Sequence, residues 1–222
     1  MKIWIISDTH GYHTLLEAPD VDMVIHCGDE ANHPNPAMNQ HESYSFFDWY
    51  RNLPIKHKIF VPGNHSTAIE AGMVLPSDYP EIKFLIHELC EIEGIRIFGS
   101  PYTPKFCDWA YMHKRNRMQA VWENLPECDI LVTHGPPKGI LDLTRDKDNG
   151  SLVQVGCKSL YNKVMELKPK IHAFGHVHTE KDCYNTAVLQ RSGITFVNAA
   201  CLSHTKEFYR GSIIEISSVE EV

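Results

Sequence analysis

The stretch Lys2-Ile3-Trp4-Ile5-Ile6-Ser7-Asp8-Thr9-His10-Gly11 combines an apolar run with a carboxylate and an imidazole. The run from Ile3 to Ile6 is typical of a buried strand, and Gly11 can begin a turn. Asp8 and His10 stand one residue apart, so on an extended backbone their side chains point to the same face. Alone, such a pair more often caps a helix or satisfies a turn than binds a metal. Its meaning depends on how the other strands end.

Other apolar runs in the chain also end in turns that carry potential metal ligands. These ligands are Asp29 after residues 23–27, Asn64 and His65 after residues 58–61, His134 after residues 130–132, and His176 and His178 after residues 171–174. Helical stripes such as Leu160, Val164 and Leu167 lie between runs of this kind. Strands that alternate with helices predict an α/β sandwich, in which ligands at strand ends gather at one edge.

Length and composition favour a single domain over residues 1–222. The chain has 43% hydrophobic residues, enough for a large core, and no linker or repeat divides it. The net charge of -7 argues against binding long nucleic acid through bulk electrostatics. Seven cysteines are scattered without a Cys-x-x-Cys pair, which favours reduced thiols. With no signal sequence or membrane span evident, we expect a cytoplasmic protein without a membrane partner.

Several local patterns give further expectations. Pro34 and Pro36 predict a loop over residues 31–42, and Ser43 is the candidate cap of the helix that follows. Residues 141–155 are polar and are expected to be irregular. Glu93-Gly94 predicts a hairpin turn between two strands.

The set of candidate donors is too large for one tetrahedral zinc ion. It comprises Asp8, His10, Asp29, Asn64, His134, His176 and His178. These side chains suit two ions roughly 3.5 to 4 Å apart, with an aspartate supplying one oxygen to each. The mixture of carboxylate, amide and imidazole favours Mn, with Fe or Zn as alternatives, over Ca.

In this order the residues form the pattern D-x-H, G-D, G-N-H, H and G-H-x-H, which resembles that of the calcineurin-like metallophosphoesterases from Asp8 to His178. The resemblance implies a four-layer α-β-β-α sandwich of two mixed sheets flanked by helices. It also implies the metal roles: one ion held by Asp8, His10 and His178, the other by Asn64, His134 and His176, and Asp29 as the bridging ligand. His65 is similar to the family's catalytic histidine, which contacts phosphate and protonates the leaving oxygen.

A closer resemblance is to the metallophosphoesterase-domain-containing subfamily. It rests on Gly99-Ser100-Pro101, Phe106-Cys107-Asp108-Trp109-Ala110, Thr133-His134-Gly135-Pro136-Pro137, Val155-Gly156-Cys157 and the stretch from Lys168 to Gly175. Residues 31–50 match it poorly. The subfamily implies phosphodiesterase activity that includes cyclic nucleotides.

One position departs from the family pattern. An Asp or Glu usually follows Gly-Asn-His and orients the histidine, but here the residue is Ser66. The strength of His65 as a general acid therefore depends on another group. Glu30 and Glu70 are both candidates to supply it.

The expected function is hydrolysis of small phosphodiesters, such as cyclic nucleotides, by a hydroxide shared between two metal ions. A phosphomonoesterase, a small nuclease and a non-catalytic protein-binding scaffold are the alternatives. Tyr102, Phe106 and Trp109 are candidates to line the substrate cleft, although aromatic loop residues equally often serve local packing. His26, His172 and His204 match no motif position and are interpreted as structural, or at most as neighbours of the metal ligands. No feature of the sequence indicates an oligomeric state.

Overall fold

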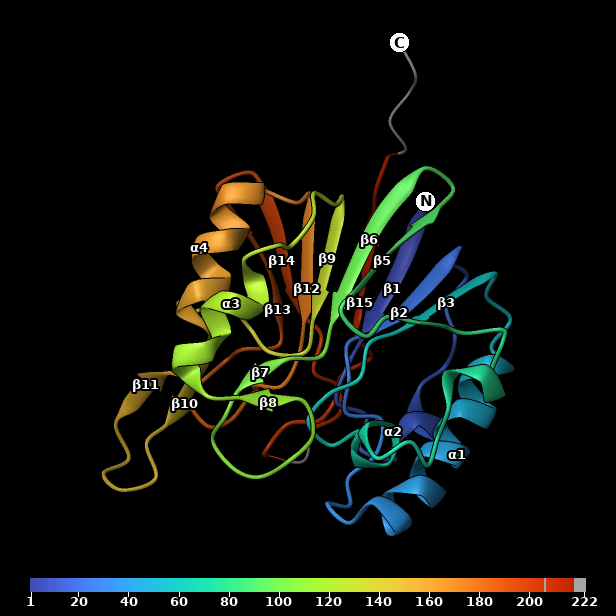
Figure 1. Ribbon diagram of the computed structural model, residues 1–222, viewed down its shortest axis with the longest axis horizontal. Helices are drawn as coiled ribbons and strands as arrows, with labels where there is room; N and C mark the ends of the chain where they lie inside the picture. Colours follow the sequence, from blue (N-terminus) through green and yellow to red (C-terminus); the bar gives the residue numbers. More distant parts are fainter. Residues whose placement is uncertain (206, 218–222) are drawn as a thin grey trace.

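The computed structural model describes residues 1–205 and 207–217, and it shows four layers (Figure 1). Two large mixed sheets pack face to face, and helices cover the outer face of each. This arrangement confirms the predicted α-β-β-α sandwich. No helix in residues 1–205 and 207–217 is both long and apolar enough to cross a membrane.

The first sheet contains the opening strand, next to one of its edges. Its strands are β1 (Lys2–Ile6), β2 (Met23–His26), β3 (His57–Phe60), β4 (Lys83–Phe84) and β15 (Ser212–Glu215), in the spatial order β15-β1-β2-β3-β4. The strands β1 to β4 are parallel, and β15 runs antiparallel to β1. Since parallel neighbours end at the same edge, the turns after β1, β2 and β3 lie next to one another.

The second sheet contains β5 (Glu88–Ile92), β6 (Ile95–Ser100), β9 (Ile130–Thr133), β12 (Ile171–Phe174), β13 (Ala187–Arg191) and β14 (Ile194–Asn198). Its order is β13-β14-β12-β9-β6-β5, with antiparallel strands at both edges. The predicted hairpin turn at Glu93-Gly94 joins β5 to β6. Both residues have positive φ, 50° and 77°, a conformation that favours glycine at the second position.

The side chains of β1 alternate between the two faces of the first sheet, and this alternation explains the layers. Ile3 and Ile5 face the core between the two sheets, and Trp4 and Ile6 face the helices outside the first sheet. All four side chains are at most 1% exposed. A strand buried on both faces needs a continuous apolar run, and the sequence supplies one.

The helix α1 (Pro36–Arg51) corrects the predicted loop over residues 31–42. It begins at Pro36 because the Asn35 side chain accepts hydrogen bonds from the N–H groups of Ala37 and Met38, while proline has no N–H to satisfy. Ser43 therefore lies inside the helix and is not its cap. Its hydroxyl faces inward, where it donates to Glu30.

The other helices are short. α2 (Thr67–Glu70) joins α1 over the first sheet, and α3 (Met118–Trp122) and α4 (Lys158–Leu167) cover the second. Single 3-10 turns occupy His13–Leu15, Pro76–Asp78 and Arg115–Arg117.

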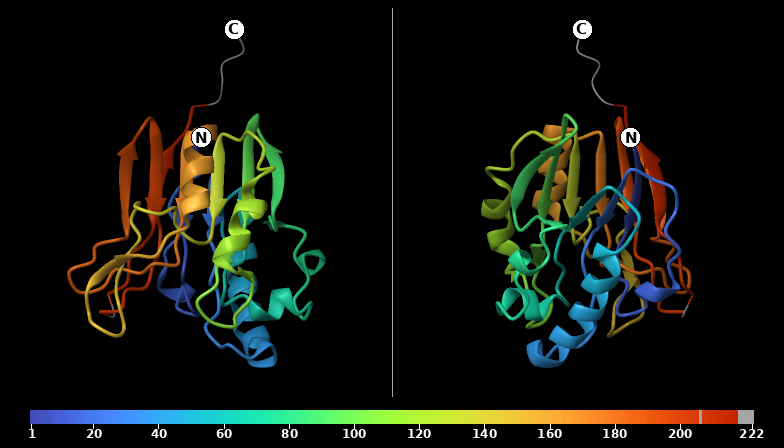
Figure 2. Two further views of the ribbon diagram at one scale, coloured as in Figure 1. Left: turned by 60° about the vertical axis from the view of Figure 1, so that its left-hand side comes forward. Right: turned by 90° about the vertical axis from the view of Figure 1, so that its right-hand side faces the viewer.

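Residues 141–155 were expected to be irregular, and this expectation was wrong. β10 (Leu143–Arg145) and β11 (Leu152–Gln154) form an antiparallel hairpin, which Asn185 fixes by a hydrogen bond to the Leu143 N–H at 3.0 Å. β7 (Thr103–Pro104) and β8 (Met112–His113) pair in a second small sheet. Both features extend beyond the carboxyl ends of the long strands (Figure 2).

The two large sheets meet at this same end of the molecule. A single parallel bridge pairs Ser7, just after β1, with Ala200, just after β14. The Cys201 N–H donates to the Ser7 carbonyl at 2.8 Å. The carboxyl ends of the parallel strands of both sheets thus lie side by side at one end of the sandwich, which we call the floor of the site.

Candidate metal centre

The sequence-predicted ligands converge on this floor. Four of them, Asp8, His10, Asp29 and His176, have φ between 44° and 68°, in the left-handed region that non-glycine residues seldom adopt. Such strained backbone concentrates at functional sites, where the surrounding structure holds it in place.

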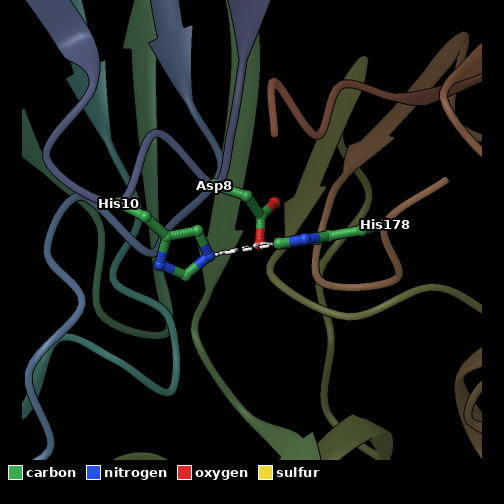
Figure 3. Close-up of side chains that lie close together, drawn as sticks. All are labelled: Asp8, His10 and His178. Atoms are coloured by element: carbon green, nitrogen blue, oxygen red, sulfur yellow. Dashed lines mark hydrogen bonds and ion pairs between the residues drawn. The ribbon is translucent and has the colours of Figure 1, made fainter. Parts of the chain in front are cut away.

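Asp8, His10 and His178 form the first cluster (Figure 3). Asp8 Oδ1 lies 3.1 Å from His178 Nε2 and 3.9 Å from His10 Nε2. The two imidazole nitrogens are 3.4 Å apart. His10 Nδ1 donates to the Ala31 carbonyl at 3.1 Å, so in the neutral ring the lone pair of Nε2 points toward Asp8.

Asp29, Asn64, His134 and His176 form the second cluster. His134 Nε2 lies 2.9 Å from Asn64 Oδ1, 3.1 Å from His176 Nδ1 and 3.3 Å from Asp29 Oδ2. His134 Nδ1 donates to the Cys27 carbonyl at 2.8 Å, which directs Nε2 inward. His134 and Asn64 are at most 2% exposed.

Asp29 belongs to more than one group of close donors. Its carboxylate lies near His134 and His176, and also near His10 and His65, with each group's atoms within 4.8 Å of one another. The main-chain N–H of His176 donates to Asp8 Oδ2 at 2.8 Å, which ties the first cluster to the second.

These donors fit a metal ion on chemical grounds. Ring nitrogens from different histidines face each other at hydrogen-bond distance, while carbonyl groups fix the far side of two of these rings. Carboxylate, amide oxygen and imidazole are the ligands that borderline divalent ions take, and outer carbonyl partners orient such imidazoles. The His and Asp clusters could therefore hold a divalent metal.

The electrostatics of the site favour positive charge beside each carboxylate. Burial alone would raise the pKa of Asp8, but the hydrogen bond and charge of His178 outweigh it and lower this pKa. Burial would lower the pKa of His134, but the nearby Asp29 raises it to about 9. Burial dominates at His10 and His176, where it lowers the pKa to about 4 and about 3. These two imidazoles are neutral and available as ligands at neutral pH.

His65 lies at the rim of the second cluster. Its main-chain N–H donates to Asp29 Oδ1 at 2.7 Å, and its Nδ1 donates to the Asn32 carbonyl at 2.9 Å. Nε2 is then the ring atom on the side of the clusters, 4.0 Å from Asp29 Oδ2. Trp109 packs edge-on against the ring, with centroids 3.6 Å apart.

A cleft of about 550 Å³ opens over the clusters. Of the predicted aromatic residues, Phe106 lines it and is 62% exposed. Trp109 contacts the cleft through His65, whereas Tyr102 packs against His87 and His113, outside the lining.

Sequence reasoning missed one whole wall of this cleft. Arg115 and the β10–β11 hairpin line it, the hairpin through Thr144, Arg145, Asp146, Lys147 and Val153. The polar composition of the hairpin gave no periodic signal. Arg115 lies in the 3-10 turn Arg115–Arg117, outside every motif.

Of the histidines outside the motifs, His26, His172 and His204 have different surroundings. His26 and His172 are fully buried and bond to the hydroxyls of Thr9 and Thr133, as structural residues do. His204 instead lines the cleft, with its ring centroid 5.1 Å from that of His178.

A four-layer sandwich with a His and Asp centre at its joined sheet edges defines a class of metal-binding α/β proteins. More particularly, the chain belongs to the calcineurin-like phosphoesterase family, whose model matches residues 1–180. Membership supports a metal-dependent hydrolase and confirms the resemblance seen in the motifs.

Two curated relatives cover most of the chain. Metallophosphoesterase domain-containing protein 1 from Homo sapiens is 30% identical over 222 residues, covering 88% of this chain and 64% of that protein. The chain therefore spans less than two thirds of that relative's length. A UPF0046 protein from Caenorhabditis elegans is 33% identical over 223 residues, covering 90% of this chain and 74% of that protein.

Solved structures share the fold at low identity. The protein TT1561 of Thermus thermophilus has a TM-score of 0.56 at 16% identity and covers 89% of this chain and 88% of its own. Phosphopantetheinyl hydrolase from Mycobacterium tuberculosis has a TM-score of 0.56 at 14% identity, with 92% and 90% covered.

Proposed function

We propose that this protein is a two-metal phosphodiesterase that hydrolyses small nucleotide phosphodiesters. The observation that carries the proposal is the position of Asp29, whose carboxylate is close to donors of both clusters. A carboxylate with two usable oxygens can serve as ligand to two ions. Asp8, His10 and His178 would hold one ion, Asn64, His134 and His176 the other, and Mn suits this donor mixture best.

When bound, such ions lower the pKa of water and offset the charge of a phosphate. Hydrolysis forms a bond between phosphorus and a water oxygen and breaks the bond to the leaving oxygen. That oxygen needs a proton to depart as an alcohol. The imidazolium form of His65 can donate it from Nε2 and is left as the neutral ring with its proton on Nδ1, which the Asn32 carbonyl accepts. Asn64 helps to hold the phosphate at the second cluster.

The cleft supports a small nucleotide diester as substrate. Its volume of about 550 Å³ lies within the range of small-molecule sites. Phe106 offers an exposed ring on which a base can stack, and Arg115, Arg145 and Lys147 bring positive charge to the lining of the cleft. The net charge of -7 disfavours a long polynucleotide.

Metal content and hydrolysis of bis-p-nitrophenyl phosphate with Mn²⁺ test the proposal. We expect metal-dependent turnover in the wild type and its loss in Asp29→Asn. Asp129→Asn is the matched control, because Asp129 lies at the start of β9, at the far end of the second sheet, and bonds to the Arg96 N–H and Lys170. Equal, metal-independent rates in wild type and Asp29→Asn would end the proposal.

The substrate class needs its own comparison. The metal-loaded protein should hydrolyse 2′,3′-cyclic or 3′,5′-cyclic nucleotides faster than a simple phosphomonoester. A preference for the monoester would identify a phosphomonoesterase instead. Cleavage of oligonucleotides in preference to both would identify a nuclease.

A further inference from the structure

We propose that Glu30 is the positioning residue for His65 and supplies, from another loop, the carboxylate that the family pattern places directly after Gly-Asn-His. The inference rests on the proposed function, in which His65 is the general acid. It concerns how this chain holds that histidine when Ser66 occupies the position of the usual acid.

Glu30 directly follows Asp29 in the chain and is fully buried, at 0% exposure. Its carboxylate accepts a hydrogen bond from Ser66 Oγ at 2.6 Å and another from Ser43 Oγ at 2.8 Å. An unpaired buried carboxylate would be strongly destabilising, whereas this one is bonded at both oxygens. Both oxygens of the buried Glu30 carboxylate therefore have a hydrogen-bond donor in the folded protein.

Ser66 connects that carboxylate to the turn of residues 63–66. Ser66 is the N-cap of α2, yet its side chain caps no helical N–H. The hydroxyl instead accepts from the Gly63 N–H at 2.9 Å and donates its hydrogen to Glu30. A serine is short enough to leave room for the carboxylate of a neighbouring loop, so the acid reaches the same turn from residue 30.

The turn that Glu30 holds contains His65. A second contact from α1 secures its far side, since Asn39 Nδ2 donates to the His65 carbonyl at 2.6 Å. Asn39 Oδ1 accepts from the Ala68 N–H at 3.1 Å and lies 3.3 Å from Ser43 Oγ. Glu30, Ser43, Asn39 and Ser66 thus form one buried network that fixes both flanks of His65. The direction of the imidazole toward Asn32 depends on it.

Glu70, the other acidic candidate, is engaged elsewhere. Its Oε1 accepts the Tyr111 N–H at 2.7 Å and therefore supports the loop before β8. Glu30 is the carboxylate that contacts the turn of residues 63–66 through Ser66.

Three variants of the metal-loaded protein test this role. Glu30→Gln keeps the volume, but the amide puts an NH2 donor where one carboxylate oxygen accepts from a serine, so one of the two serine hydroxyls loses its acceptor on residue 30. Glu30→Ala/Ser66→Glu returns a carboxylate to the emptied space from the position of the family's acid. Asp129→Asn controls for removing a paired carboxylate away from the site.

The substrates are the phenyl and p-nitrophenyl esters of thymidine 5′-phosphate, which differ in their need for leaving-group protonation. Glu30→Gln should lower kcat on the phenyl ester at least about tenfold more than on the p-nitrophenyl ester, as expected when a general acid is misplaced. The double variant should recover most of this ratio, and Asp129→Asn should keep the wild-type ratio.

Nitrogen NMR of labelled histidines gives a readout that does not need turnover. The His65 signal, assigned by its loss in His65→Gln, should show the Nδ1–H form in wild type and in the double variant, and a mixture in Glu30→Gln. A folded Glu30→Gln protein that keeps both the wild-type tautomer and the wild-type ratio would overturn the inference. So would a loss in Glu30→Gln that the folded double variant does not recover. Absence of any turnover in the wild type would instead refute the phosphodiesterase function, and NMR would still decide the role of Glu30.

Discussion

Replacement of His172 by glutamine should remove part of the acid sensitivity of this protein. His172 lies on β12, fully buried against Phe174 and Phe196. Thr133 Oγ1 donates its hydrogen to the Gly135 carbonyl, so His172 Nε2 must donate to Thr133 Oγ1, at 2.9 Å. Its Nδ1 has no hydrogen-bond partner in the described part of the chain. A proton added there would be a buried charge without a counter-ion.

The size of the effect follows from linkage. Burial lowers the pKa of His172 from its usual 6.5 to about 3, so the unfolded state takes up the proton first. The stability that the neutral ring contributes is complete above pH 6.5 and is lost as the pH falls toward 3. About pH 5 is about 1.5 units below the pKa of the unfolded state. Protonation of His172 in the unfolded state therefore lowers the free energy of unfolding by about 2 kcal/mol at this pH.

Urea unfolding at about pH 7.5 and about pH 5, in buffer with chelator, measures this difference. Gln retains a donor for Thr133 and has no proton equilibrium, so His172→Gln should lose about 2 kcal/mol less than wild type between the two conditions. His41 is exposed on α1, and His41→Gln should behave as wild type. Identical losses in wild type and His172→Gln would refute the assignment of a buried neutral imidazole.

Three further changes have defined outcomes. A Cβ at Gly175 would collide with Asp8 Oδ2 and Ser7 Oγ, so Gly175→Ala should cost about 1 to 3 kcal/mol in thermal unfolding and impair metal uptake. Gly94→Ala, in the open β5–β6 turn, is the control: it should lower the stability by about 1 kcal/mol because of the positive φ at Gly94, and it should bind metal normally. Equal metal uptake by the Gly175→Ala and Gly94→Ala proteins would contradict the steric argument. Burial would lower the pKa of His134, but Asp29 outweighs burial and raises this pKa to about 9. Metal binding must therefore displace a proton and should strengthen from about pH 6.5 to about pH 8.5. Calorimetry in two buffers counts the displaced proton, and a metal affinity that does not change with pH would contradict this prediction. Phe106→Ala should raise KM for a nucleotide more than for a small aryl phosphate, because the exposed Phe106 ring lines the cleft, whereas equal changes would count against base stacking.

The fold and the ligand positions were predictable because both follow from local sequence pattern. An apolar run such as residues 3–6 has few alternatives to a buried strand, and its carboxyl end must lie at the sheet edge. Parallel neighbours then bring Asp8 and Asp29 together, although they are far apart in the chain. The family model that matches residues 1–180 spans all of these motifs.

The parts that sequence reasoning missed depend on contacts rather than on pattern. The first half of α1 contains few apolar residues, and its start is set by Asn35 and Pro36, a cap that looks like a loop signal in the sequence. The β10–β11 hairpin is polar because it lies over a cleft, and it depends on Asn185 from a distant segment. The partnership of Glu30 with Ser66 joins two loops, so no local pattern contains it.

Because the bridge between Ser7 and Ala200 joins the two sheets at the metal centre, the geometry of that centre depends on how the sheets are positioned relative to each other. The first cluster takes Asp8 and His10 from one sheet and His178 from the other, and the second is divided in the same way. A slip of one residue along a strand moves side chains by about 3.3 Å, more than a coordination shell tolerates. Substitutions in the apolar layer between the sheets, far from any candidate ligand, should therefore change the metal affinity even when the protein remains folded.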